Sequence, residues 1–205
     1  VHELAHTLLN TPDLYFTFGY PYAAGPYSLM DQDIRLPNMD PYNRMLAKWD
    51  TPVELTKDGH YTIGSNGEIY KITNPKNENE FYLIENRQAT EPYERLPDSG
   101  IAIWHIIKDP KIYRTLPAPP KADPKKWNEI APHDWGRRAI KLLKPPYSHP
   151  LDFRTALWDG CHKKTGKGFV TQWNDGSEVF AITDISCSKE TMDFNLDLNL
   201  TQRVK

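Results

Sequence analysis

The 205-residue sequence predicts an α+β fold, with helical structure near its start and mainly antiparallel β-structure after residue 58. Two observations predict the helices: a helix-favouring run over residues 1–9, and an amphipathic pattern that begins at Asp40-Pro41. A third observation predicts the sheet structure. Short runs rich in β-branched and aromatic residues, bounded by Gly, Pro or Asn, recur after residue 58.

The first predicted helix covers residues 1–9 and ends at a turn. The turn is Asn10-Thr11-Pro12-Asp13, in which Asn10 tolerates a left-handed backbone and Pro12 cannot continue the helix. Residues 10–39 are then expected to form a long irregular loop. Loops of that length in compact domains are usually functional.

The second predicted helix runs over residues 40–50. Asp40 is the expected N-cap, and Pro41 occupies the first helical position. Apolar residues at spacings i, i+3, i+4 and i+7 form one face: Tyr42, Met45, Leu46 and Trp49. We expect this face to pack against the first helix, and residues 50–52 to end the second.

The predicted strands fall into two groups. The first group is 61–63, 69–73, 80–85 and 100–107. The second is a hairpin of 179–186 and 191–198, with its turn at 188–190 and these residues alternating inward: Met192, Phe194, Leu196 and Leu198. A Pro-rich segment at about 108–157 separates the groups. It is predicted to be an insertion, with a short helix around Trp135–Leu143.

Charge and hydropathy exclude some classes of partner. The net charge is −2 and the basic residues between Lys111 and Lys144 are dispersed, so we expect no nucleic-acid partner. No apolar run approaches the ~20 residues that cross a bilayer, so no transmembrane segment is expected. Cys161 and Cys187 could form one disulfide in a secreted chain, and the glycosylation sequon at 199–201 is also typical of secretion. The oligomeric state is not readable from the sequence.

The most specific short motif is His2-Glu3-Leu4-Ala5-His6, an H-E-x-x-H pattern. On a helix, His2 and His6 are four residues apart, so both imidazoles lie on one face and can bind one tetrahedral zinc ion. Glu3 stands beside the metal and can take a proton from zinc-bound water, whose pKa the metal lowers to about 7. The alternative is a surface helix that carries these three residues by chance.

A third ligand requires a chain reversal after the helix. Asp13, at the end of the predicted turn, is the first position that offers a carboxylate oxygen, and its alternative role is to cap that turn. The first glutamate after Glu3 is Glu54, far beyond the turn. The sequence therefore favours His2, His6 and Asp13 as the ligand set.

Several segments, in order along the chain, resemble the immune inhibitor A family of secreted zinc metallopeptidases. Residues 2–15 resemble its zinc helix and following loop, residues 25–31 resemble its Met-turn, and the similar downstream segments are 81–88, 96–105, 173–182, 185–186 and 192–194. The resemblance implies a metzincin-like catalytic subdomain. Residues 1–58 would be the C-terminal part of the catalytic domain, and residues 59–205 the β-rich domain.

The resemblance also implies roles for single residues: His2, His6 and Asp13 as zinc ligands, Glu3 as the general base and Met30 as the apolar floor of the site. The turn departs from the family pattern. Leu9 stands where the family has glycine, and Asp13 lies one residue further from the second histidine. We expect Asn10 to supply the left-handed conformation that glycine normally gives.

Two other groups of residues carry open alternatives. Asp31, Asp33 and Asp40 offer oxygen ligands for the structural calcium that the family often carries, or they serve as turn and cap residues. His105 lies on an apolar strand, where a hydrogen-bonded core or near-surface histidine is favoured over a metal ligand.

The predicted function is zinc-dependent endopeptidase activity on a protein or peptide substrate, in a secreted protein. The chain is expected to be an N-terminally truncated segment, because in the family the half of the cleft that pairs with an extended substrate precedes the zinc helix. One alternative is a non-catalytic remnant or binding module derived from such a peptidase. A zinc aminopeptidase is another, and substrates cleaved at free amino termini rather than at internal bonds would identify it.

Overall fold

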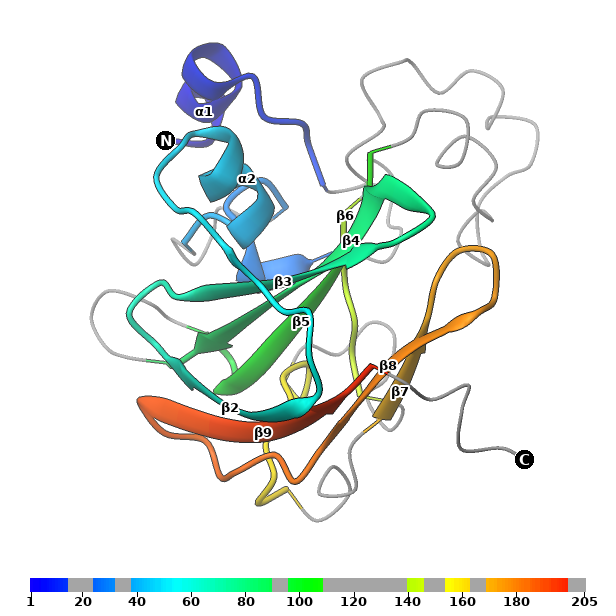
Figure 1. Ribbon diagram of the computed structural model, residues 1–205. Helices are drawn as coiled ribbons and strands as arrows, with labels where there is room; N and C mark the ends of the chain where they lie inside the picture. The colour runs from blue at the N-terminus through cyan, green and yellow to red at the C-terminus, as the bar shows by residue number, and fades with distance from the viewer. Residues whose placement is uncertain are drawn as a thin grey trace, which may run out of the picture.

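The computed structural model describes residues 1–14, 24–31, 38–89, 96–108, 140–145, 154–162 and 169–198. Two β-sheets lie one above the other, and the helices gather beyond one of them (Figure 1). Strands hold 40% of the described residues and helices 13%. The expected α+β fold with a metzincin-like catalytic subdomain is therefore wrong. In the described part of the chain β-structure predominates over helix, and the helices are short elements laid on a sheet.

The first sheet has five strands in the order β1-β3-β4-β5-β6. Their bounds are β1 Val53–Glu54, β3 Ile69–Asn74, β4 Asn77–Arg87, β5 Gly100–Ile107 and β6 Ile140–Leu142. β1 runs parallel to β3, and the other neighbours are antiparallel. β4 and β5 pair along the whole of β5, from Glu80 opposite Ile107 to Arg87 opposite Gly100.

The second sheet has four antiparallel strands in the order β2-β9-β8-β7. Their bounds are β2 Gly59–Gly64, β7 Phe169–Gln172, β8 Glu178–Thr183 and β9 Thr191–Asp197. The predicted hairpin is confirmed, because β8 and β9 are antiparallel neighbours. Met192, Phe194 and Leu196 are buried on one face of β9, as their alternation predicted.

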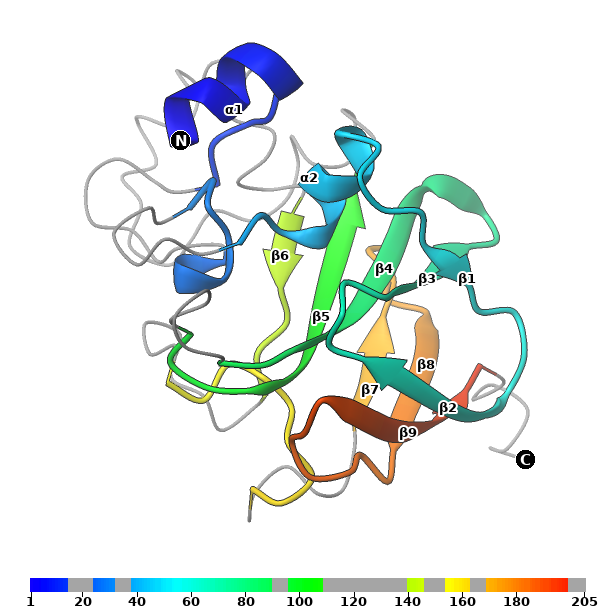
Figure 2. The same cartoon turned by 90° about the vertical axis from the view of Figure 1, so that its left-hand side faces the viewer.

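β4 and β5 form the middle layer of the molecule and are buried on both faces (Figure 2). Phe81 and Leu83 of β4 belong to one hydrophobic cluster, together with Trp104 of β5. Tyr82 and Ile84 belong to the other cluster, which contains the inner face of the second sheet. A strand buried on both faces has no solvent side, which explains the unbroken apolar run of residues 81–84 in β4 and the nearly continuous one in β5.

The helical segments cover the face of the first sheet that points away from the second sheet. They are α1 His2–Leu9, the 3-10 turn η1 Gly25–Tyr27 and α2 Pro41–Leu46. Helices this short are marginal alone, and packing stabilises them. Ala5, Leu14 and Met30 belong to the same cluster as Phe81 and Leu83. This cluster joins residues on both sides of position 58, and the domain boundary expected there stays a prediction.

α2 is shorter than predicted. Asp40 caps it as expected, since its carboxylate accepts a hydrogen bond from the Asn43 N–H at 2.9 Å. The helix ends at Leu46, and Lys48 takes a left-handed backbone conformation with φ of 59°. Leu46 and Trp49 are therefore 40% and 60% exposed instead of completing the expected apolar face.

Three strands were not predicted: β1, β6 and β7. The short helix predicted around Trp135–Leu143 is wrong at residues 140–142, which form β6, while 135–139 lie outside the described residues. Ile140 and Leu142 are buried at the edge of the first sheet, paired with β5. Sheet pairing with a distant strand thus overrides local propensity in this segment.

Candidate metal centre

α1 places His2 and His6 on one face, because they are four residues apart. Asn10 ends the helix with a left-handed backbone at φ 53°, and its N–H donates to the carbonyl oxygen of His6 at 3.1 Å. The prediction that Asn10 supplies this conformation is confirmed. Asn is one of the few non-glycine residues that adopts it readily. The chain then reverses and brings Asp13 back toward the helix.

Asp13 completes a cluster with the two histidines. Its Oδ1 lies 3.0 Å from His2 Nε2 and 3.1 Å from His6 Nε2, and the two Nε2 atoms are 3.1 Å apart. The side chains of His2, His6 and Asp13 are 12%, 29% and 27% exposed, so solvent reaches the cluster. Within the described ranges, this is the one group of three or more His, Cys, Asp or Glu side chains spaced to hold a metal ion.

The other ring nitrogen of each histidine faces a backbone carbonyl. His2 Nδ1 donates to the Leu29 carbonyl, and His6 Nδ1 donates to the Thr11 carbonyl, both at 2.7 Å. A carbonyl oxygen only accepts, so the proton of each neutral ring is on Nδ1 and a lone pair is on Nε2. Two imidazole lone pairs and a carboxylate oxygen of Asp13 therefore face one another. A cation at their centre would stabilise this arrangement.

Met30 is buried and linked to the loop that carries Asp13. Thr11 Oγ1 donates to the Met30 sulfur at 3.5 Å, and the Leu14 N–H donates to the Met30 carbonyl at 2.8 Å. These bonds tie the Asp13 loop to the turn whose carbonyl accepts from His2. The position of the histidines thus depends on two segments that are distant in the sequence.

Glu3 is exposed on the first turn of α1, directly after His2. Its backbone carbonyl accepts a hydrogen bond from Thr7 Oγ1 at 3.1 Å. Its side chain is reachable from solvent on the helix that carries both histidines. The role of Glu3 as general base stays a prediction.

Asp31 is a buried carboxylate in the turn that contains Met30. Its Oδ2 accepts from the N–H groups of Ala24 and Gly25, both at 2.6 Å. Its Oδ1 is buried and has no hydrogen-bond partner among the described residues. Burial raises the pKa of Asp31 to about 7, even though the two backbone hydrogen bonds lower it.

Asp40 is also buried, and it accepts from Ser28 Oγ at 2.7 Å in addition to capping α2. Burial raises the pKa of Asp40 as well. Asp31 and Asp40 both act as turn or cap residues in the structure. Asp33 lies outside the described residues, and the calcium site stays a prediction.

His105 is hydrogen-bonded, as the sequence favoured. Its Nε2 lies 2.8 Å from Glu80 Oε1, and its ring stacks on Tyr82 with centroids 4.4 Å apart. Burial by itself would raise the pKa of Glu80, but hydrogen bonds from His105 and from the Asn174 N–H hold it below its usual value. This pair is a structural element of β4 and β5.

Sequence reasoning missed a buried network around Glu85, near the end of β4. Arg44 Nη2 donates to Oε2 at 2.9 Å, while Arg87 Nη1 and Trp104 Nε1 donate to Oε1 at 3.3 and 3.0 Å. Burial alone would raise the pKa of Glu85, but the charges of Arg87 and Arg44 lower it. A signal was present, because Glu85-Asn86-Arg87 directly continues a buried apolar run. Charged residues at such positions must be paired.

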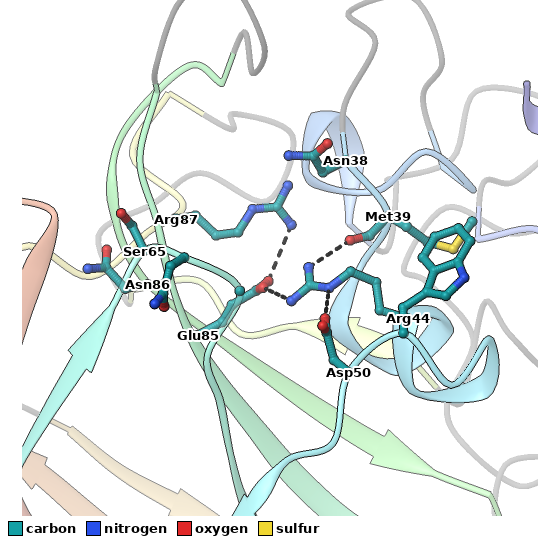
Figure 3. Close-up of a pocket in the computed structure, with 11 residues that line it drawn as sticks. Asn38, Met39, Arg44, Asp50, Ser65, Glu85, Asn86 and Arg87 are labelled. Atoms are coloured by element: carbon teal, nitrogen blue, oxygen red, sulfur yellow. Dashed lines mark hydrogen bonds and ion pairs between the residues drawn. The ribbon is translucent and has the colours of Figure 1, made fainter.

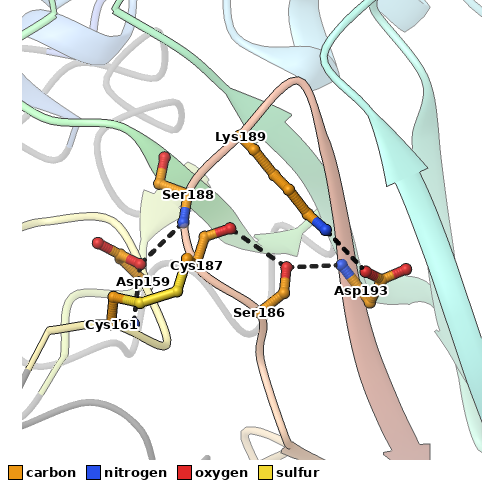
Figure 4. Close-up of a disulfide and its surroundings, with 7 residues drawn as sticks. All are labelled: Asp159, Cys161, Ser186, Cys187, Ser188, Lys189 and Asp193. Atoms are coloured by element: carbon orange, nitrogen blue, oxygen red, sulfur yellow. Dashed lines mark hydrogen bonds and ion pairs between the residues drawn. A yellow bond between two sulfur atoms is a disulfide. The ribbon is translucent and has the colours of Figure 1, made fainter.

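Cys161 and Cys187 form a disulfide that joins the segment after β6 to the β8–β9 turn (Figure 4). Asp159 Oδ1 accepts from the Cys161 N–H at 3.0 Å and from the Ser188 N–H at 2.9 Å. The disulfide and the hydrogen bond from the Ser188 N–H to Asp159 therefore both join this segment to the turn. The glycosylation sequon at 199–201 lies outside the described residues.

Within the parts of the chain that the structure describes, no helix is both long and apolar enough to span a bilayer. Comparison with known proteins finds no relative for this chain. No protein-family model, no curated protein and no solved structure matches it.

Proposed function

We propose that this protein hydrolyses peptide bonds in a zinc-dependent reaction, with His2, His6 and Asp13 as zinc ligands and Glu3 as the general base. The observation that carries the proposal is the convergence of two Nε2 nitrogens and one carboxylate oxygen, with separations of 3.0 to 3.1 Å. The segments that resemble the immune inhibitor A family, which occur in the same order along the chain as in that family, favour the same chemistry.

The cluster fits the chemistry of a catalytic zinc ion. Ligands of a tetrahedral zinc with bonds of about 2.0–2.1 Å are separated by about 3.3 Å, slightly more than the separations here. Two imidazoles and a carboxylate are all common zinc ligands, and catalytic sites keep three protein ligands and one open position. The partial exposure of all three side chains leaves room for a water molecule or a substrate at that position.

Zinc bound there would polarise the scissile carbonyl and lower the pKa of the attacking water. The carbonyls of Leu29 and Thr11 orient His2 and His6 and fix their Nε2 lone pairs, which is the usual role of outer partners at metal sites. A Glu3 carboxylate oxygen takes the proton of the attacking water and then gives it to the nitrogen of the leaving amine.

Secretion belongs to the same proposal. The pairing of Cys161 with Cys187 supports it, because disulfides persist in oxidising compartments and are rare in the cytosol.

The test separates metal binding from turnover. Zinc affinity is measured by competition with a chelating dye, and turnover by cleavage of quenched fluorescent peptides whose amino termini are acetylated. The wild type is expected to bind one zinc ion and to cleave internal bonds. His2→Ala should lose zinc and turnover together, whereas Glu3→Gln should keep zinc and lose turnover.

Each failure has its own meaning. A wild-type chain that binds no zinc would sink the metal proposal. Full activity in Glu3→Gln would remove Glu3 from the mechanism. Cleavage only of peptides with free amino termini would indicate an aminopeptidase.

A non-catalytic binding module is the second candidate. The mostly β architecture favours it, because helices hold only 13% of the described residues. Stoichiometric zinc binding without cleavage of any peptide, in both the wild type and Glu3→Gln, would support this candidate over the peptidase.

A further inference from the structure

A cavity of about 450 Å³, with both polar and apolar lining, lies between α2, the end of β4 and the turn over residues 65–67 (Figure 3). The proposed zinc ligands are not among the residues that line it. Its volume falls in the range of about 300–1,000 Å³ that is typical of small-molecule sites. We propose that this cavity binds a neutral saccharide through a hexose unit.

The charges at the floor of the cavity are balanced. Arg44 lies between Asp50 Oδ2 at 2.5 Å and Glu85 Oε2 at 2.9 Å, and Arg87 also donates to Glu85. Figure 3 shows both guanidinium groups converging on the Glu85 carboxylate. An anionic ligand at this floor would lie close to the Glu85 and Asp50 carboxylates, and a cationic ligand close to the two guanidinium groups, so either would meet a like charge. Breaking a buried pair is costly, so the floor favours an uncharged ligand.

The floor groups are also fixed in direction. Arg44 Nη1 donates to the Met39 carbonyl at 3.0 Å, in addition to its bonds with Asp50 and Glu85. These contacts with described residues use three of the five N–H groups of the guanidinium. The side chain is only 14% exposed. The cavity therefore presents a planar hydrogen-bonding group that loses little entropy when a ligand binds.

The rim supplies groups that both donate and accept hydrogen bonds. Asn38, Ser65 and Asn66 line it and are exposed. Side-chain amides and hydroxyls offer donors and acceptors within a few ångströms of each other. Each hydroxyl of a saccharide likewise donates and accepts, so the rim matches a polyhydroxyl ligand.

Trp49 adds an apolar surface to the same rim, and it is 60% exposed. Its position follows from the early end of α2, because Lys48 has a left-handed backbone and the Trp49 N–H donates to the Arg44 carbonyl at 3.0 Å. An exposed indole offers a rigid flat face at low entropic cost. The C–H face of a pyranose ring is the apolar part of a neutral sugar and can stack there.

The expected affinity is modest. A ligand of hexose size at ordinary ligand efficiency has a dissociation constant on the order of millimolar. The experiment therefore uses nuclear magnetic resonance of the full chain labelled with nitrogen-15. Its probes are the indole N–H signal of Trp49, assigned with Trp49→Phe, and the Nε–H signal of Arg44. The chain is titrated separately with glucose, galactose, mannose, N-acetylglucosamine, glucuronate and inorganic sulfate.

We expect saturable shifts of the Trp49 and Arg44 signals with at least one neutral sugar. Glucuronate and sulfate should cause smaller shifts. Absence of saturation with every neutral sugar, stronger binding of sulfate or glucuronate, or shifts confined to other tryptophans would each overturn the proposal.

Variants test the location of the site. Trp49→Ala should weaken binding about tenfold, as expected for truncation of an aromatic anchor, with Arg44 Nε–H as the readout. Trp49→Phe should keep most of the affinity, because a phenyl ring still stacks. Val53→Ala is the matched control, since Val53 is 53% exposed and does not line the cavity. Equal affinities in Trp49→Ala and Val53→Ala would contradict the assignment.

Discussion

Two clusters of charged and polar side chains differ in how far they are buried and in how their charges are paired. His2, His6 and Asp13 lie on a short helix and a loop, are partly exposed, and turn lone pairs toward one another. Glu85 and Arg87 of β4 and Arg44 of α2 are largely buried, and each of these charges faces an opposite one. In the second arrangement each charge is compensated within the fold, and removing one partner is costly. The first places two imidazole nitrogens and a carboxylate oxygen within 3.1 Å of one another at a partly exposed position, where a bound cation would add stability.

Neutralising the buried Glu85 carboxylate should give the largest change in stability. Glu85→Gln removes the buried negative charge that Arg44 and Arg87 share, although Arg44 keeps Asp50 as a counter-charge, so the free energy of unfolding should fall by about 3 kcal/mol. Urea unfolding followed by circular dichroism measures it. Glu54→Gln is the control, because Glu54 pairs with Lys71 near the surface and should change stability by less than about 1 kcal/mol. Equal losses of unfolding free energy in the two variants would show that the buried Glu85 network matters no more to stability than a surface ion pair.

Zinc should stabilise the folded protein through the cluster of His2, His6 and Asp13. The gain in free energy of unfolding should be comparable to the loss in Glu85→Gln, but it depends on the zinc concentration. At a free zinc concentration about 100 times the dissociation constant, the wild type should gain about 2.7 kcal/mol. His6→Ala should gain none and should match the zinc-free wild type within about 1 kcal/mol, because His6 is 29% exposed. Thermal unfolding with and without zinc measures both quantities.

The exposed His60 supplies the control for that experiment, with a side chain that is 63% exposed. His60→Ala should keep the full response to zinc. A zinc response that survives in His6→Ala would place the metal elsewhere.

Asp31 should make stability fall as pH rises. Its folded pKa of about 7 exceeds the ordinary value of 3.8, so the folded state binds more protons than the unfolded state between these values. From about pH 5 to pH 7, the wild type should therefore lose about 2 kcal/mol relative to Asp31→Asn. Asn keeps an acceptor oxygen for Ala24 and Gly25. Urea unfolding of both proteins across this range measures the difference, and a difference independent of pH would contradict a buried protonated Asp31.

The smallest effect concerns the turn after α1. Asn10→Ala forces an unfavourable left-handed conformation, so the free energy of unfolding should fall by about 1 kcal/mol. Asn10→Gly should be nearly neutral in stability, because glycine adopts this backbone freely. Zinc affinity should fall in Asn10→Ala and survive in Asn10→Gly. Equal zinc affinities in the two variants would mean that the turn does not position Asp13.

Local signals made part of the structure predictable. Asn10 and Asp40 mark helix boundaries through their own backbone and cap chemistry, and the structure confirms both. The strand over 100–107 was bounded correctly from its composition. The two histidines were brought together by a spacing of four residues, which requires nothing beyond one helix.

Distant contacts explain what was missed. The Glu85–Arg44 pair joins residues 41 positions apart, and no local pattern in the sequence specifies it. β6 forms because Ile140 and Leu142 pair with β5, and local secondary-structure propensity does not specify it. The fold class was wrong for the same reason. The N-terminal helices are too short to build a core, and they share one with the sheet instead.

β4 and β5 are buried on both faces, so they are expected to be the last strands to separate when the protein unfolds. Neighbouring residues of β4 point into different clusters, so separating this pair exposes both cores at once. Amide protons of these two strands should therefore exchange with solvent only through global unfolding, whereas the edge strands β2 and β7 can open alone. The order of hydrogen exchange should thus run from the edges of the second sheet inward, and the loop that holds Asp13 is anchored to the strands that open last.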